Sequence, residues 1–504
     1  MDSVYRDAGR VVIWLGEEDE TTADVFDLLE ALYDVVPRSF DSYPILVKYE
    51  TLSASGLPRH NDKRWRALEA MLSNSWFSRT WVLQEASVNT RTWIQQGSHS
   101  IEWSRLLHII LCICAARVDI RYNINLAASH YMAHFCASVI AAPSAWPLVE
   151  LLQNTQWTSS SKDVDKVFGL VGLASDQQTV KHLIDYTRDA QSLYTQVALT
   201  YLLKGEMKLL NLASDPSFSQ FRHLPTWVPD WSTWPRASPL APQISHLRAH
   251  EGRPPPRRPA RLPTLSPDGA RLTVSAHFAD RVVAIGRHLP LLRYTDRGIA
   301  FLFLEPWRRL AHEYLAESTN GRTIPLDLDL DRDLDININI DTIDDAFARL
   351  LTFECPLPRL ASDSYTRTYT RYLQHCLRHR HWQQPSSSSS SGPQDPQPDA
   401  QRDLFQFRDR MLISCRKRTF FITEQGFMGL GPFFLRPGDR VVGFEGVGAG
   451  TATGTPMAVR RRTMGIGTGK GVGRWELVGE MYIQGMMKGE GDEAGWSWED
   501  LCLV

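Results

Sequence analysis

Residues 76–86 (WFSRTWVLQEA) combine side chains that can bind a polar ligand with rings that can enclose it. Arg79 can donate hydrogen bonds, Gln84 can donate and accept them, and Glu85 can accept them or exchange a proton. Trp81 adds a large flat surface beside these polar groups. The stretch therefore suggests a polar site. The alternative is an amphipathic helix docked by its aromatic rings, with the polar groups paired to buried backbone.

A second group of polar residues follows an apolar run near the N-terminus. Residues 10–15 (RVVIWL) end at Gly16, which is typical of a strand buried on both faces of a parallel sheet. In a doubly wound sheet, ligands bind beyond the carboxyl ends of the strands. Glu17 and Glu18 are therefore binding candidates. A solvated acidic loop explains them equally well.

Several elements are expected to position these residues. Strand, acidic loop and helix together make a β-α unit. Caps and apolar spacing predict a helix over 23–35, a helix starting at Asn61 or Asp62, a helix capped by Ser78 that carries Glu85, and a strand over 90–96 before a Gly97–Ser98 turn.

Composition limits the function classes. The chain has 504 residues, is 43% hydrophobic and 22% charged, and has a net charge of -2. Neither nucleic acid nor an anionic membrane is expected as a partner. Seven cysteines, an odd number, suit a reducing compartment. Residues 106–116 are too short an apolar run to span a membrane, and the N-terminus shows no secretory signal. We therefore expect a cytoplasmic protein.

The length implies more than one domain. Proline-arginine and serine-proline runs mark linkers, and a run rich in Trp and Pro closes the middle region. The expected division is an α/β part at 1–100, a helical region at 101–250, a linker at 251–270, a mixed region at 271–385, a disordered linker at 386–401 and a β-rich subdomain at 402–504.

The sequence contains no complete metal-binding or phosphate-binding motif. Residues 326–345 repeat Asp at alternate positions, but they lack the glycine and the terminal glutamate of a calcium loop. A low-complexity insertion is the preferred interpretation. Residues 465–473 (GIGTGKGVG) fit no phosphate-binding loop. We expect no metal site.

The last hundred residues turn β-rich. Short apolar stretches separated by Gly and Pro-Gly turns predict a small barrel or a curled sheet. Residues 272–286 alternate like a pair of strands. The overall class expected is α+β, with an α/β N-terminal part, a helical middle and a β-rich C-terminal region.

Taken together, several motifs resemble the fungal heterokaryon incompatibility (HET) domain proteins. They are YRDAGRVVIWLG, WFSRTWVLQEA, DKVFGLVGLAS, LPTWVPDWS, TEQGFMGLGP, GDRVV and LVGEMYIQGMMKGE, and they cover most of the chain. Family members normally begin with a further segment that holds a Tyr/Leu/Ser-x-x-Trp-Gly motif. This sequence lacks that segment, so it resembles a truncated HET domain without its N-terminal half.

The resemblance implies a role in fungal non-self recognition and programmed cell death, with other proteins of the incompatibility pathway as partners. It also implies an incomplete doubly wound sheet like that of Toll/interleukin-receptor domains, some of which cleave NAD. On that alternative, Glu85 would be the catalytic carboxylate, Trp81 would orient the base, and NAD would be a substrate, with no cofactor required. A third alternative is an inactive, truncated relative. Demonstrable enzyme activity is not the leading expectation.

Overall fold

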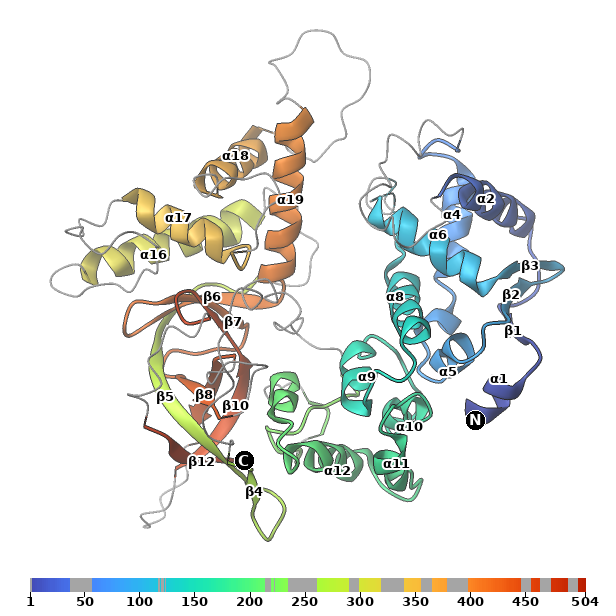
Figure 1. Cartoon of the computed structure of the whole chain (residues 1–504). Coiled ribbons are helices and arrows are strands. Elements are labelled where there is room, and N and C mark those ends of the chain that lie inside the picture. The colour runs from blue at the N-terminus through green and yellow to red at the C-terminus, as the bar shows by residue number, and fades with distance from the viewer. Residues whose placement is uncertain are drawn as a thin grey trace. The chain divides into compact units, whose positions relative to one another are not determined.

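The computed structural model describes residues 2–36, 57–116, 118, 122, 124–213, 219–221, 223–233, 261–289, 299–318, 340–354, 365–378, 398–445, 455–462, 473–487 and 497–504 (Figure 1). The chain forms two compact units. Unit 1 comprises Met1–Val197 and Trp231–Trp234, and unit 2 comprises Ala198–Asp230 and Pro235–Val504.

Unit 1 contains a mixed sheet. Strand β1 (Val11–Trp14) pairs in parallel with β2 (Thr92–Gln96), and β2 pairs antiparallel with β3 (His99–Glu102). The β2–β3 turn contains Gly97 with φ +53°, a conformation that glycine adopts without steric cost. The expected strand and turn are confirmed in this hairpin, whereas the likeness to Toll/interleukin-receptor domains is not confirmed.

Strand β1 is not buried on both faces, so that prediction was wrong. Val11 and Ile13 are buried, but Val12 and Trp14 are 47% and 49% exposed. Among the described residues β1 pairs with β2 alone, so it lies at an edge of this sheet. A continuous apolar run does not distinguish a central strand from an edge strand whose outer face is apolar.

Helices make up the rest of unit 1, in agreement with the predicted helical middle. They are α1 (Asp2–Asp7), α2 (Thr22–Val35), α4 (Lys63–Leu72), η2 (Ser75–Ser78), α5 (Val82–Ser87), α6 (Trp103–Ala115), α8 (Ala127–Ala141), α9 (Leu148–Asn154), α10 (Asp165–Val171), α11 (Gln177–Val180) and η3 (Lys181–Leu183). Helix α12 (Ala190–Leu202) runs from unit 1 into unit 2. Asp62 caps α4 through its carboxylate, which accepts from the Arg64 N–H at 3.0 Å.

Unit 2 contains a closed β-barrel. The strands are β4 (Thr264–Leu265), β5 (Leu272–Ile285), β6 (Arg418–Thr423), β7 (Met428–Pro432), β8 (Arg440–Phe444), β9 (Met457–Arg461), β10 (Arg474–Glu480), β11 (Tyr482–Ile483) and β12 (Glu499–Leu503). Strand β5 pairs with both β12 and β8, and β12, β10, β9 and β8 pair in that order, so these strands close into a ring. The predicted β-rich C-terminal region is confirmed.

Strand β5 is one long strand rather than the expected pair. Its register shifts between Phe278 and Asp280, and again between Val282 and Ala284. Such bulges bend a strand. The first half of β5 therefore belongs to the ring, and the second half leaves it to pair with β6, which continues to β7 and β11.

Helices pack on the β6–β7 side of unit 2 (Figure 1). They are the π-helical turn η6 (Ala300–Leu304), α16 (Glu305–Ser318), α17 (Ile340–Leu350), α18 (Tyr365–Arg378) and α19 (Pro398–Cys415). These helices share one buried apolar cluster with the two strands, including Trp307, Phe347, Phe407 and Phe420. This cluster supports the barrel from outside. The short helix η4 (Met207–Leu212) instead contacts β10.

The aspartate-rich run is only partly an insertion. Residues 326–339 lie outside the described residues, but helix α17 begins at Ile340. Asp344 accepts two hydrogen bonds from Arg308, at 2.7 and 2.6 Å, and one from His312 at 2.6 Å. The end of the run therefore packs into the helical layer, because Asp344 accepts hydrogen bonds from the neighbouring helix α16.

Two tryptophans of the Trp- and Pro-rich run are buried. Trp227 and Trp231 are 0% and 1% exposed. Thr226 attaches the run to the barrel, since its N–H donates to Val504 O at 2.9 Å and its Oγ1 accepts from the Leu477 N–H at 2.9 Å. The predicted division into six parts stays a prediction.

Candidate functional site

The stretch at 76–86 is divided into three parts. Helix η2 ends at Ser78, Arg79 is extended, Thr80 lies in a bend, and α5 begins at Val82. Arg79 forms an isolated parallel bridge with Ser159, and the Thr80 N–H donates to Ser159 O at 2.9 Å. The expected helix that carries Glu85 is present as α5, but the prediction that Ser78 caps it was wrong, because α5 begins at Val82 and the segment before it pairs with Ser159.

Trp76 anchors the stretch. It is 7% exposed and packs edge-on against Trp103, with ring centroids 5.8 Å apart, and against Phe77 at 5.1 Å. Trp103 donates its indole N–H to Ala86 O at 2.9 Å. Trp81 is only half-buried. The aromatic anchor is therefore Trp76, at the start of the stretch.

Glu85 lies between two aromatic residues. Its carboxylate accepts from the Trp76 indole N–H at 3.5 Å, a long contact, and from the Tyr5 hydroxyl. Burial, followed by the negative charge and hydrogen bond of Glu85, raises the pKa of Tyr5. Glu85 thus links α5 to α1 and η2. These contacts agree with the alternative in which Glu85 holds the fold together rather than performing chemistry.

Gln84 is buried and joins α5 to α10. Its Nε2 donates to Gly169 O at 2.9 Å, and its Oε1 has no hydrogen-bond partner among the described residues. A Cβ at Gly169 would lie 3.0 Å from Thr80 Cγ2 and 3.6 Å from the Trp81 ring. A larger residue at this position would require the Thr80 methyl group to move by a few tenths of an ångström. The two motifs WFSRTWVLQEA and DKVFGLVGLAS pack directly against each other.

Lys166 is a residue that sequence reasoning missed. It is 5% exposed, and its ammonium donates to Thr158 O and lies 3.4 Å from Thr158 Oγ1. The Thr158 hydroxyl is 2.9 Å from that of Thr80. A lysine within an otherwise apolar run was the available signal, because lysine is seldom buried without hydrogen-bond partners.

Arg79 and Glu17 are both exposed. Within the described ranges, neither side chain has a hydrogen bond or an ion pair. The Glu17 carbonyl accepts from Gln96 Nε2 at 3.4 Å. Both side chains remain accessible to a partner in solution.

Two of the acidic side chains after β1 accept hydrogen bonds from neighbouring turn and helix residues. Glu18 accepts from the Ser98 N–H at 3.1 Å and the Ser98 hydroxyl at 2.7 Å, which tie it to the β2–β3 turn and lower its pKa. Asp19 accepts from the Thr21 N–H at 2.8 Å and from the Thr22 hydroxyl at 3.1 Å at the start of α2, and these bonds lower its pKa. Glu18 is therefore a turn anchor.

The sequence-predicted residues form two separate groups. Arg79, Trp81, Gln84 and Glu85 belong to the joint between η2, α5 and α10, whereas Glu17 and Glu18 follow β1. Across the described chain, no hydrogen bond or ion pair joins the two groups. Asn74 links their supporting elements, since its Nδ2 donates to Leu15 O at 3.0 Å and its Oδ1 accepts from the Trp76 N–H at 2.9 Å.

Buried Cys136 gives the first testable prediction. The Ser87 hydroxyl donates to its sulfur at 3.3 Å, and burial raises the pKa of this thiol to about 12. Its folded pKa exceeds its unfolded pKa, so stability is complete below about pH 8.5 and falls as pH rises toward 12. Between about pH 8 and 10 the free energy of unfolding should therefore fall as the pH rises. We expect Cys136→Ala to make this fall less steep by up to about 1.4 kcal/mol per pH unit, measured by urea unfolding. An unchanged slope would contradict burial of the thiol.

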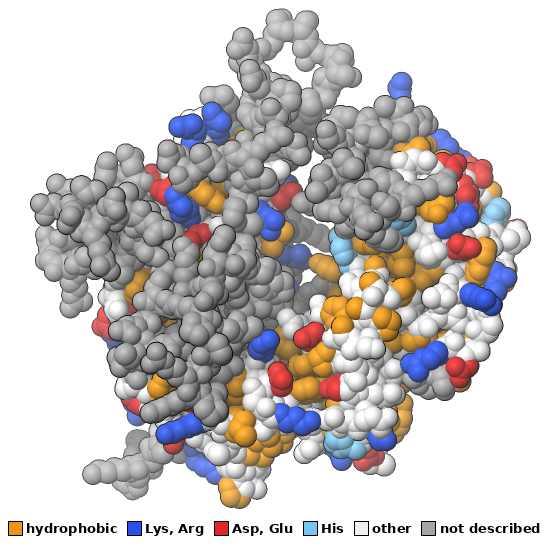
Figure 2. Space-filling view, in the orientation of Figure 1, with side chains coloured by type: hydrophobic (Ala, Val, Ile, Leu, Met, Phe, Trp, Pro, Cys, Tyr) orange, Lys and Arg blue, Asp and Glu red, His pale blue; other side chains and the backbone are white. Residues whose placement is uncertain are grey.

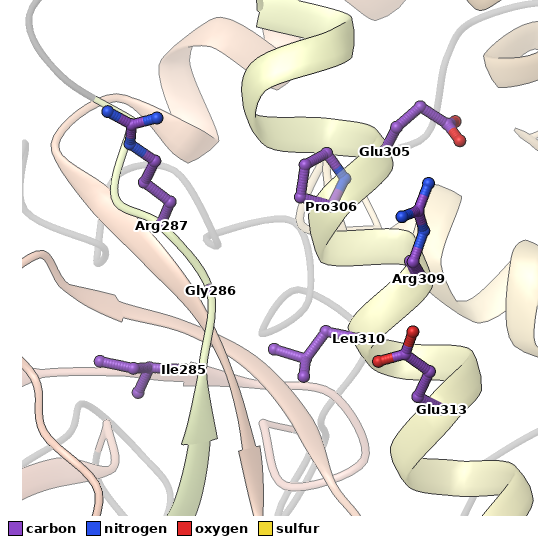
Figure 3. Close-up of a pocket in the computed structure, with 8 residues that line it drawn as sticks. All are labelled: Ile285, Gly286, Arg287, Glu305, Pro306, Arg309, Leu310 and Glu313. Atoms are coloured by element: carbon purple, nitrogen blue, oxygen red, sulfur yellow. The ribbon is translucent and has the colours of Figure 1, made fainter.

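A pocket of about 570 Å³ lies in unit 2 between the end of β5 and α16 (Figure 3). Ile285, Pro306 and Leu310 supply its apolar lining. Figure 3 shows that the polar groups of Arg287 and Glu305 point away from each other. Arg287 and Glu305 therefore do not form a paired polar site in this pocket.

The described part of the chain shows neither a metal-binding cluster nor a membrane-spanning helix. No group of three or more His, Cys, Asp or Glu side chains there is arranged to hold a metal ion. None of the described helices is both long and apolar enough to cross a membrane. On the face shown in Figure 2, acidic and basic side chains are interspersed.

Comparison with known proteins gives two domain matches. Residues 1–85 match the family model of the heterokaryon incompatibility protein (HET), and residues 403–503 match that of the Het-6 beta-barrel domain. The structure shows that the barrel also requires β5, at Leu272–Ile285, which lies outside the matched range. No solved structure matches the chain.

A curated relative is similar over almost the whole chain. It is the heterokaryon incompatibility protein 6, OR allele, of Neurospora crassa, 23% identical over 551 residues that span 97% of this chain and 78% of the relative. The chain thus combines a region that matches the HET family model, at residues 1–85, with a region that matches the Het-6 β-barrel model, at residues 403–503, and it is similar along almost its whole length to a fungal heterokaryon incompatibility protein.

Proposed function

We propose that this chain acts in fungal non-self recognition and signals programmed cell death by associating with other proteins. The observation that carries the proposal is the presence of a HET region and a Het-6 barrel in one chain that aligns along 97% of its length with a heterokaryon incompatibility protein. Its partners would be proteins of the incompatibility pathway, and its location would be the cytoplasm.

The contacts of the signature residues support action through structure rather than through chemistry. Gln84 bonds to Gly169 at 2.9 Å, and Glu85 bonds to Trp76 and Tyr5. The hydrogen bonds of these two side chains link α1, η2, α5 and α10. Glu85 is therefore proposed as a positioning residue that holds the joint in one conformation.

Inducible expression in a filamentous fungus tests the proposed function. We expect hyphal compartments that express the chain to take up a vital dye, whereas compartments that express the isolated tag do not. Normal growth at matched protein levels would contradict a role in cell death.

NAD hydrolysis is the second outcome to be measured. Purified protein incubated with NAD is expected to release no nicotinamide above the uncatalysed rate. Release that is lost in Glu85→Gln would instead assign a catalytic role to Glu85, with NAD as the substrate.

A further inference from the structure

Strand β1 presents an unusual edge. Val11 and Leu15 donate backbone N–H groups to Arg91 O and Gln95 O of the β2 segment, at 3.0 and 2.9 Å. In a strand, alternate residues direct their backbone groups to opposite sides. The N–H and C=O groups of Val12 and Trp14 therefore face away from β2, where β1 has no strand neighbour among the described residues.

The same two residues carry exposed apolar side chains. Val12 and Trp14 are 47% and 49% exposed and project from the face opposite the buried Val11 and Ile13. Trp93, which lies beside Val12 on β2, is half-buried and extends this apolar surface. An open edge with an apolar face favours pairing with another strand.

Charges of opposite sign stand at the two ends of β1. Arg10 precedes the strand, with its guanidinium 4.6 Å from the centre of the Trp93 ring. Glu17 follows the strand and is exposed. An antiparallel copy of β1 would bring each charge beside its opposite, so the edge is complementary to itself.

We propose that two copies of this chain associate through antiparallel pairing of their β1 strands. With Ile13 opposite Ile13 of the second copy, Val12 and Trp14 exchange backbone hydrogen bonds with Trp14 and Val12 of that copy. Their side chains then form cross-strand apolar pairs on the exposed face. Arg10 lies beside Gly16 and Glu17 of the second copy. This two-fold arrangement is closed and joins the two sheets into one.

Sedimentation of the purified full chain tests the association. A small interface of this kind is weak, so we expect a monomer–dimer equilibrium between about 1 and 200 µM. Arg10→Glu and Glu17→Arg each place like charges together at both ends of the pairing. Each variant alone should raise the dissociation constant about tenfold or more. A wild-type chain that stays monomeric throughout this range would overturn the proposal.

Mixing the two charge variants gives the sharper result. Arg10→Glu and Glu17→Arg chains should bind each other, because opposite charges then meet at both ends, although neither binds itself. The variant with both substitutions should regain self-association. The proposed register would be overturned if the mixture and the double variant both failed to associate while circular dichroism showed that the variants are folded.

A further test places a lysine on the exposed face of β1, because natural edge strands carry lysines that prevent pairing with other strands. Trp14→Lys should abolish dimerisation, whereas Ile184→Lys, at a residue 45% exposed outside this sheet, should not. A dimer that survives Trp14→Lys would place the interface elsewhere and overturn the proposal. The inference is independent of the proposed function, because it is tested without any cell-death readout.

Discussion

Replacing Asp439 with Asn is expected to destabilise the barrel of unit 2 by about 3 to 5 kcal/mol. The Asp439 side chain is 2% exposed, and its two oxygens accept from Arg460 Nε and Nη2, each at 2.8 Å. It also accepts from the Arg436 N–H at 2.8 Å. The neutral amide leaves the half-buried guanidinium without its counter-charge and places an N–H₂ group against these donors. The loss of unfolding free energy is measured by urea unfolding, monitored by hydrogen exchange in peptides from the barrel.

A matched control lies in the same barrel. Asp500 on β12 has a side chain 70% exposed and sits 3.8 Å from Arg261. Exposed pairs of this kind contribute about 0 to 1 kcal/mol. Asp500→Asn should therefore leave unfolding almost unchanged. Equal effects of the two substitutions would contradict a structural role for the buried pair.

Trp76→Ala is expected to destabilise unit 1 by about 3 to 5 kcal/mol. The substitution removes a ring that is 7% exposed and packs against Phe77 and Trp103. It also removes the indole N–H that contacts Glu85. The measurement is the midpoint of chemical unfolding, read by hydrogen exchange in peptides that cover residues 76–86.

Trp81→Ala is the comparison within the same stretch. Trp81 is half-buried and covers Gly169. Its truncation exposes less apolar surface and should cost about 1 to 2 kcal/mol. A larger loss for Trp81 than for Trp76 would overturn the assignment of Trp76 as the anchor.

The sequence predicted those features that depend on local patterns. Helix α2, the β2–β3 hairpin with its Gly97 turn, and the β-rich C-terminal region follow from capping residues, spacing and turn residues. The shape of β5 could not be predicted, because its partners on β8, β12 and β6 lie far away in the sequence. A long alternating run permits one bent strand as readily as two.

The sequence singled out residues 76–86 as a candidate site but did not predict their contacts. The polar and aromatic content marked 76–86 as a distinctive stretch, but it did not show which tryptophan would be buried. Trp76 meets Trp103, and Thr80 meets Thr158, only after the chain has folded. The role of Lys166 was missed for the same reason, since its partner Thr158 lies outside its own helix.

The most direct test of the central claim, that the 76–86 stretch acts through its structure, is the death response of hyphae that express Glu85→Gln. Glutamine keeps the length of the side chain and an oxygen for the Trp76 and Tyr5 hydrogen bonds. We predict that, at matched levels, Glu85→Gln gives the same response as the killing proposed for the unchanged chain. Loss of killing by a Glu85→Gln protein that unfolds at the wild-type urea concentration would contradict the claim and assign chemistry to Glu85.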